Sequence, residues 1–193
     1  MKPTLPAQLS RGVLVFLASS LLLAADDTGG NVPPASGSLC DLSGTVDLTP
    51  LKVEDTTTLE MTKNADGSPA IKAVFNNSPS GLALSFLKFP VPAGGWNLTG
   101  YTAIHVNVTN SNSTENFVRL RVDNPGNPAT NFNADGVKIP PGETKTLAVV
   151  FGKNFGNPAK VNFDPSNVIG IMLYVDKPAT ETTLVISNLI AVK

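Results

Sequence analysis

Apolar and polar residues alternate in short runs over most of the chain, and no stretch shows a sustained apolar period of 3.6 residues. The runs are rich in Val, Ile, Thr and Phe, and Gly, Pro, Asn and Asp separate them. Such alternation predicts half-buried β-strands. Ten strands are predicted, at Leu51–Val53, Thr57–Lys63, Ala70–Asn76, Ala83–Phe89, Ala103–Thr109, Phe117–Asp123, Gly136–Ile139, Lys145–Phe151, Gly170–Asp176 and Thr183–Val192. The sequence therefore predicts an all-β fold, a β-sandwich of the jelly-roll type.

Two similar segments indicate which positions on these strands face the core. NLTGYTAIHVNV (Asn97–Val108) and DPSNVIGIMLYV (Asp164–Val175) each combine a turn with alternating apolar residues. Successive side chains of a strand leave opposite faces of the sheet, so one phase is internal. On these strands and on Phe117–Asp123 the predicted core positions are Ile104, Val106, Val108, Val118, Leu120, Val122, Ile171, Leu173 and Val175.

The opposite phase of the same three strands is mostly polar. If the strands are neighbours in one sheet, one face presents His105, Asn107, Arg119, Arg121, Met172, Tyr174 and Asp176. An ordinary solvated sheet face is one interpretation. The other is a ligand face, because Arg, His, Asn and Tyr carry planar donors suited to sugar hydroxyls and sugar rings.

The beginning of the chain has a different composition. Met1, Lys2 and Arg11 precede the apolar run GVLVFLASSLLLAA, which ends in small residues. This arrangement is typical of a secretory signal peptide, whereas a membrane span needs roughly 20 apolar residues. We therefore predict a signal peptide over residues 1–25 and a secreted protein, extracellular or periplasmic.

The rest of the chain is predicted to be a leader followed by one domain. Residues 26–46 are rich in Pro, Gly and Ser and are expected to be a flexible leader, and residues 47–193 form the domain. The single Cys, Cys40, is either a buried small residue or a loose thiol in that leader. With 14 basic and 15 acidic residues the formal net charge is −1, so nucleic acid is not an expected partner.

Motifs for catalysis and metal binding are missing from the sequence. It contains no Gly-x-Ser-x-Gly elbow, no His-Glu-x-x-His and no Cys/His ligand spacing. NFNADG (Asn131–Gly136) resembles the start of a calcium loop, but Gly142 stands where such a loop closes with Glu. We expect a surface loop closed by an Asp-Gly turn.

Four segments together resemble one known family. GGWNLTGYTAIHVNVTN, VRLRVDNPG, IPPGETKTLAVVFG and the terminal TTLVISNLIAVK are similar to the galactose-binding-like jelly-roll modules appended to agarases and related polysaccharide-degrading enzymes. The resemblance covers roughly residues 47–193. Its most specific element is the Trp-x-Leu-x-x-Tyr sequence from Trp96 to Tyr101.

The resemblance implies a non-catalytic carbohydrate-binding module whose partner is a galactose-based, agar-like polysaccharide, with a separate catalytic domain or enzyme beside it. Such modules often hold a structural calcium ion with acidic residues in the first and last strands. Here Ser187 stands where Asp is common. We therefore expect no cofactor and disfavour structural calcium.

Within this interpretation the carbohydrate-binding residues are Tyr174, Arg119, Arg121, His105, Asn107, Asp176 and Trp96. Tyr174 is the expected sugar-stacking residue, and Trp96, expected at the edge of the core, is the second choice. One alternative is a structural or adhesive extracellular β-sandwich protein without a sugar ligand. Another is a jelly-roll polysaccharide lyase, with Tyr174 as proton donor and His105 as base beside Arg119 and Arg121, although the Gln-x-His strand of those lyases is missing.

Overall fold

The computed structural model describes residues 31–42, 48, 51–53, 57–76, 84–160, 162–176 and 181–193. The predicted signal peptide lies outside these residues. The described part contains one 3₁₀ turn, η1 (Ala35–Gly37), and the strands β1 (Lys52–Val53), β2 (Thr57–Lys63), β3 (Pro69–Phe75), β4 (Leu84–Phe89), β5 (Ala103–Asn110), β6 (Asn116–Asp123), β7 (Phe132–Ile139), β8 (Thr144–Val150), β9 (Lys153–Asn154), β10 (Asn157–Pro158), β11 (Gly170–Asp176) and β12 (Thr182–Val192).

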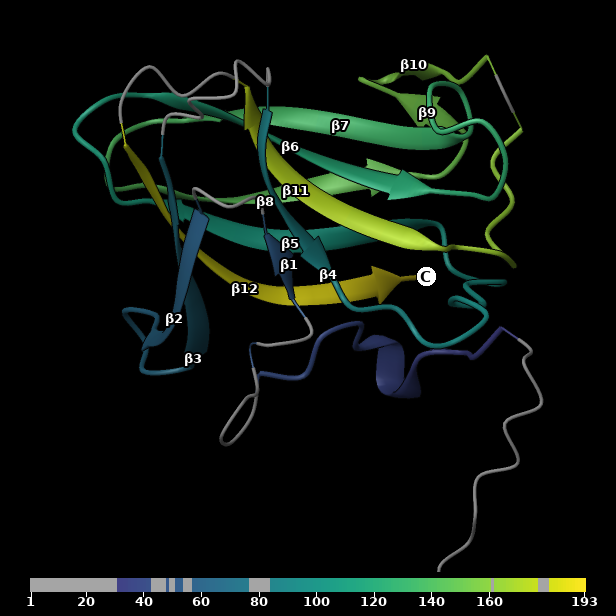
Figure 1. The fold of residues 1–193 in the computed structure, drawn as a ribbon, viewed down its shortest axis with the longest axis horizontal. Coiled ribbons are helices and arrows are strands. Elements are labelled where there is room, and N and C mark those ends of the chain that lie inside the picture. Colours follow the sequence, from purple (N-terminus) through teal and green to yellow (C-terminus); the bar gives the residue numbers. More distant parts are fainter. Residues whose placement is uncertain are drawn as a thin grey trace, which may run out of the picture.

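The strands form two stacked antiparallel sheets and a small hairpin (Figure 1). The first sheet has the order β1-β4-β11-β6-β7, and the second sheet has the order β2-β3-β12-β5-β8. β9 and β10 pair with each other. The all-β sandwich predicted from the alternation is confirmed, and each of the ten predicted strands corresponds to an observed one.

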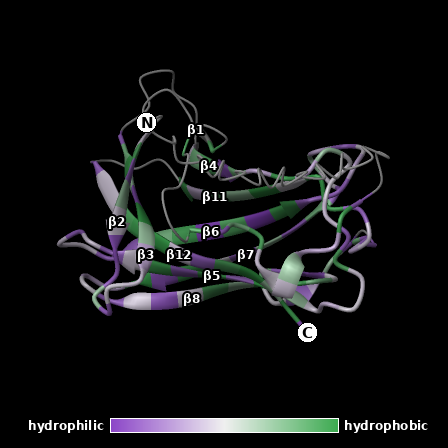
Figure 2. Ribbon diagram, turned by 90° about the horizontal axis from the view of Figure 1, so that it is seen from below, coloured by the Kyte–Doolittle hydropathy of each residue, from purple (hydrophilic) through white to green (hydrophobic). Residues whose placement is uncertain are grey.

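A single hydrophobic core lies between the two sheets. All nine predicted core positions are buried, and they join Ile71, Phe75, Leu87, Leu147 and Leu184 from the neighbouring strands. The strands accordingly carry both hydrophobic and hydrophilic residues along their length (Figure 2). The inward phase assigned from the sequence is therefore correct on β5, β6 and β11.

The three strands do not share a sheet, however. β6 pairs with β11 and with β7, whereas β5 pairs with β12 and β8 in the second sheet. The connection from Asn110 to Asn116 thus carries the chain from one sheet to the other. Because the outward faces of the two sheets point in opposite directions, the prediction of one shared polar face is wrong for β5.

β7 begins earlier than the sequence suggested. Residues 132–136, expected as a surface loop, are paired with β6, and Gly136 lies opposite Arg119. A Cβ atom on Gly136 would come within 2.5 Å of Cζ of Phe117. This glycine therefore leaves room for an aromatic ring across the strands, and the Asp-Gly pair does not form a turn.

Part of the expected flexible leader packs on the sandwich. Leu39 and Leu42 are buried in the core, and the backbone N–H of Leu39 donates to the carbonyl of Leu189 over 3.0 Å. Val32 forms a bridge with Trp96. Two leucines and these backbone hydrogen bonds thus hold residues 31–42 against the domain. Across the described residues, no helix has the length and apolar character needed to cross a membrane.

Truncation of Leu120 to Ala should lower the free energy of unfolding by about 2–5 kcal/mol, because its fully buried side chain would leave a cavity. Denaturant unfolding measures the change. Val150→Ala, at an exposed position of β8, is the control and should cost much less. Equal losses for the two variants would contradict the assignment of the core.

Because residues 31–42 pack against the domain, we expect the thiol of Cys40 to react slowly with alkylating reagents. Burial, with a smaller contribution from the neighbouring Asp41 carboxylate, raises the pKa of its thiol. At pH 8 less thiolate is present than on an unshielded cysteine, so alkylation by iodoacetamide should be slower in the folded protein than in urea. Equal rates in both conditions would show that residues 31–42 are detached in solution.

Candidate functional site

The outer face of the first sheet brings three predicted site residues together. Tyr174 pairs with Arg119 across β11 and β6, and Met172 pairs with Arg121. These side chains lie on one face because directly paired residues of antiparallel strands point the same way. Asp176 ends the same strand, opposite Leu84. Its side chain lies outside the described residues.

His105 and Asn107 lie on the other side of the molecule. On the outer face of the second sheet, His105 is paired with Ala148 and Ile190, and Asn107 with Thr146 and Ser187. The predicted constellation is therefore divided between two faces. The arrangement required by the lyase hypothesis is absent, because its proposed base, His105, is in the second sheet, whereas the arginines and Tyr174 are in the first.

Tyr174 is on the predicted face, but it is not an exposed platform. Its side chain is only 7% exposed. The Arg119 guanidinium carbon lies 5.8 Å from the centroid of its ring. Neighbouring side chains on this face cover the ring, so the expectation of an open stacking surface at Tyr174 is wrong.

Phenylalanines that the sequence analysis overlooked surround this arginine. Phe117 shares the outward phase of β6, and the Arg119 guanidinium carbon lies 4.9 Å from the centroid of its ring. The same atom lies 5.5 Å from the ring of Phe155. Cations above aromatic faces are attracted by the ring quadrupole. Phe86 on β4 joins the face opposite Tyr174. In the sequence, Phe117 lies two residues before Arg119 on the same predicted strand, so alternation alone could have placed it on the outward face. Phe86 has the outward phase of its own predicted strand in the same way.

Phe155 is the most unusual of these residues. It occupies the turn of the β9–β10 hairpin with φ of 49°, and Gly156 follows with φ of 76°. Its backbone N–H donates to the carbonyl of Ala134 over 2.9 Å, which ties the hairpin to β7. The residue is 46% exposed. An accessible aromatic side chain thus stands beside Arg119, on a turn that the sequence analysis did not predict.

Arg121 holds the neighbouring loop in place. Its Nε donates to Oδ1 of Asp123 over 2.6 Å, and one of its terminal nitrogens donates to the carbonyl of Pro128. Its guanidinium carbon also lies 4.2 Å from the centroid of the Phe132 ring. These contacts occupy much of the guanidinium group. Arg121 therefore positions the loop from Asn124 to Asn131.

That loop forms one wall of a hollow of about 650 Å³ at the end of the same face. Met172 and Gly170 of β11 line the hollow. Its other lining residues include Lys88, Asp123, Asn124 and Pro128. This volume is within the roughly 300–1,000 Å³ typical of small-molecule sites. Met172 and Tyr174 are two residues apart on one strand and share the outward phase, so the hollow and the aromatic cluster adjoin.

Trp96 lies elsewhere, at the edge of the core as expected. It is half-buried against the core and forms bridges with Val32 and Val168. Within the described part of the chain, its indole N–H has no hydrogen-bond partner. In the same residues, no group of three or more His, Cys, Asp or Glu side chains could hold a metal ion.

No protein-family model matches the sequence, and no curated protein matches it. The fold is similar to that of several solved structures. An exo-beta-agarase superposes with a TM-score of 0.61 at 14% identity, over 80% of this chain and 25% of its own. A family 11 carbohydrate-binding module from Clostridium thermocellum, in complex with a beta-1,3-1,4-mixed-linked tetrasaccharide, gives 0.57 at 13% identity, over 81% of this chain and 94% of its own.

A xylan-binding domain from carbohydrate-binding module family 22 gives a TM-score of 0.53 at 12% identity, over 82% of this chain and 96% of its own. The chain thus spans about a quarter of the agarase but nearly the whole length of the two modules. At these identities the likeness shows the fold, and it confirms the jelly-roll sandwich that the sequence predicted.

Replacement of Arg121 by Met should lower the free energy of unfolding by about 1–2 kcal/mol, because the side chain loses its ion pair and its hydrogen bond to the loop. Hydrogen exchange should accelerate over residues 124–131. Lys138→Met is the matched control, since that cation is 71% exposed in its pair with Glu115 and should contribute less than about 0.5 kcal/mol. Equal effects of the two changes would refute the positioning role.

Proposed function

We propose that this protein is a non-catalytic carbohydrate-binding module that binds a polysaccharide on the outer face of the first sheet. The observation that carries the proposal is Phe155, an exposed ring held beside Arg119 and Tyr174 in a backbone conformation unfavourable for phenylalanine. Solved structures with a similar fold include a module in complex with a tetrasaccharide and a xylan-binding domain, which supports the same class of ligand.

The backbone conformation of the turn indicates that Phe155 does not serve stability. A two-residue hairpin with positive φ at both positions strongly favours Asn-Gly or Asp-Gly. A bulky residue in this region is an outlier, and such strain clusters at binding and catalytic sites. Phe155 is also exposed, so the protein gains little from burying its ring. An accessible aromatic ring is suited to the apolar C–H face of a sugar.

The rest of the face supplies complementary groups for a chain of sugars. Arg119 is held against Phe117, Phe155 and Tyr174. The adjoining hollow offers the thioether of Met172 together with the charged groups of Lys88 and Asp123. A mostly apolar surface with a few fixed polar groups is the usual composition of a small-molecule site. We therefore place one part of the ligand at Phe155 and another in the hollow.

We further propose that the ligand is galactose-based and agar-like, and that the protein is secreted. The sequence resemblance to agarase-associated modules and the likeness of fold to an exo-beta-agarase support the first point. The basic and apolar beginning of the chain supports the second. The proposal includes no cofactor and no structural calcium, because the acidic positions common in such modules are depleted at Ile186-Ser187-Asn188.

Replacement of Phe155 by Asn should separate binding from stability. The sequence Asn-Gly suits a turn with two positive φ values, so the variant should be about 1 kcal/mol more stable than the wild type. Loss of the ring should weaken binding about fivefold or more, close to 1 kcal/mol. Calorimetry with agarohexaose, a mixed-linked β-glucan tetrasaccharide and xylohexaose measures the affinity and identifies the sugar.

His105→Ala is the control, because this residue lies on the opposite sheet and should leave binding at Phe155 unchanged. Wild-type affinity in the Phe155 variant would remove the aromatic hairpin from the site. If the wild type binds none of the three oligosaccharides and no insoluble polysaccharide, the structural or adhesive alternative replaces this proposal.

A further inference from the structure

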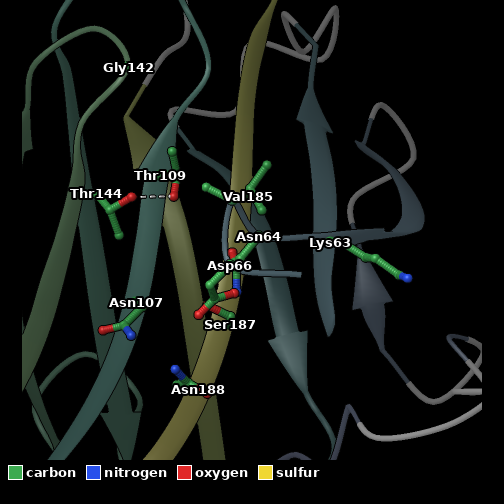
Figure 3. A pocket seen from close by; sticks show the side chains of 11 residues that line it. Lys63, Asn64, Asp66, Asn107, Thr109, Gly142, Thr144, Val185, Ser187 and Asn188 are labelled. Carbon is green, nitrogen blue, oxygen red and sulfur yellow. Dashed lines mark hydrogen bonds between the residues drawn. The ribbon is translucent and has the colours of Figure 1, made fainter. Parts of the chain in front are cut away.

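The second sheet carries a separate polar hollow on its outer face, of about 380 Å³ (Figure 3). β5 contributes Asn107 and Thr109 to its lining, β8 contributes Thr144, and β12 contributes Val185, Ser187 and Asn188. The turn between β2 and β3 forms another side through Asn64 and Asp66, while the Lys63 side chain points away. The lining side chains are therefore mostly amides and hydroxyls, with the Asp66 carboxylate and the aliphatic side chains of Ala65 and Val185.

Ser187 contributes a hydroxyl to the lining of the hollow. The residue is only 4% exposed, so what remains accessible of it faces the hollow. A hydroxyl both donates and accepts hydrogen bonds, which suits a sugar hydroxyl.

Asn188 contributes an amide group to the same hollow. β12 has an irregularity in its pairing with β5 between Ser187 and Ile190, and Asn188 within it has φ of 53°. Its amide group is exposed at the edge of the hollow and makes no hydrogen bond within the described residues. Bulges of this kind redirect a side chain and are common beside functional sites. Here the bulge turns an amide toward the hollow that contains Ser187.

The other polar groups are partly satisfied and hold their orientation. Thr109 and Thr144 share a hydrogen bond of 2.7 Å between their hydroxyls. Thr146 donates to Oδ1 of Asn107 over 2.9 Å, which leaves the Asn107 amide nitrogen without a partner in the described structure. Fixed amides and hydroxyls, which both donate and accept, match the hydroxyls of a neutral sugar better than they match an ion.

We infer that this hollow is a second saccharide site, distinct from the Phe155 face and smaller than it. The inference rests on the proposed function, because it takes the ligand to be the same neutral polysaccharide. This hollow has no aromatic ring among its described lining residues, and Val185 and Ala65 are its aliphatic side chains, so it should bind more weakly. Since the two sites lie on opposite sheets, one protein molecule would bridge two polysaccharide chains.

Two substitutions test the site without threatening the fold. Ser187→Ala removes the hydroxyl that lines the hollow, and Asn188→Gly removes the amide group while glycine accepts the positive φ. Both variants should be at least as stable as the wild type. Amide chemical shifts during titration with agarohexaose, the β-glucan tetrasaccharide and xylohexaose report the two faces separately.

In the wild type, one oligosaccharide should perturb residues 107–109, 144–146 and 185–188 as well as residues near Phe155. Each of the two variants should weaken the first effect about tenfold and leave the second unchanged. Phe155→Asn should do the reverse. Perturbation near Phe155 alone, or an unaltered response of the hollow in both variants, would overturn the second site while keeping the proposed function. Absence of any perturbation would overturn both.

Bridging gives a further readout of the same inference. The wild type should make dilute agarose solutions turbid, whereas Ser187→Ala and Phe155→Asn should each lose most of this effect, because each keeps one functional face. Turbidity that persists in Ser187→Ala and in Asn188→Gly would show that the second sheet does not contribute to bridging.

Discussion

Each strand of this sandwich has two faces, and the core between the sheets occupies one of them. Burial of the alternate apolar side chains on β5, β6, β11 and β12 fixes the position of every strand. The remaining face of each strand is what the molecule can offer to a partner. Which outward residues act together then depends on which sheet holds their strand. This constraint divides the polar residues into two groups on opposite sides of the protein.

Much of this arrangement could be predicted from local sequence. Alternation gave the strands and the inward phase, because side-chain direction depends only on the neighbouring backbone. Sheet membership depends on long-range pairing, and β5 and β6 have the same kind of pattern in different sheets. His105 and Asn107 were therefore separated from Arg119 and Tyr174 by a feature that alternation does not encode.

Burial on the outer faces was equally hard to foresee. Tyr174 is covered although its phase points away from the core, because Arg119 and its neighbours pack on top of the sheet. The β9–β10 hairpin is only two residues long on each side, and its turn sequence, Phe155-Gly156, lacks the usual Asn or Asp. The turn that differs from the common pattern is also the turn that exposes an aromatic ring. Gly136, by contrast, is a glycine because the ring of Phe117 packs against it, whereas the sequence analysis predicted an Asp-Gly turn at this position.

The two outer faces share one physical property. Phe155 on one side and Asn188 on the other both have positive φ. Each of these features costs stability, and in each case a common substitution would relieve it. Proteins retain such costs most readily where a ligand is bound. The conformational strain and the composition of the faces therefore support the same interpretation.

The central claim is that sugar binds on the outer face of the first sheet. A crystal structure of the protein soaked with the oligosaccharide that binds most tightly tests it most directly. Our account predicts a sugar ring against the exposed side of Phe155 and further density toward Met172 and Lys88. A saccharide bound only at the loops around Trp96, with the Phe155 face empty, would contradict it.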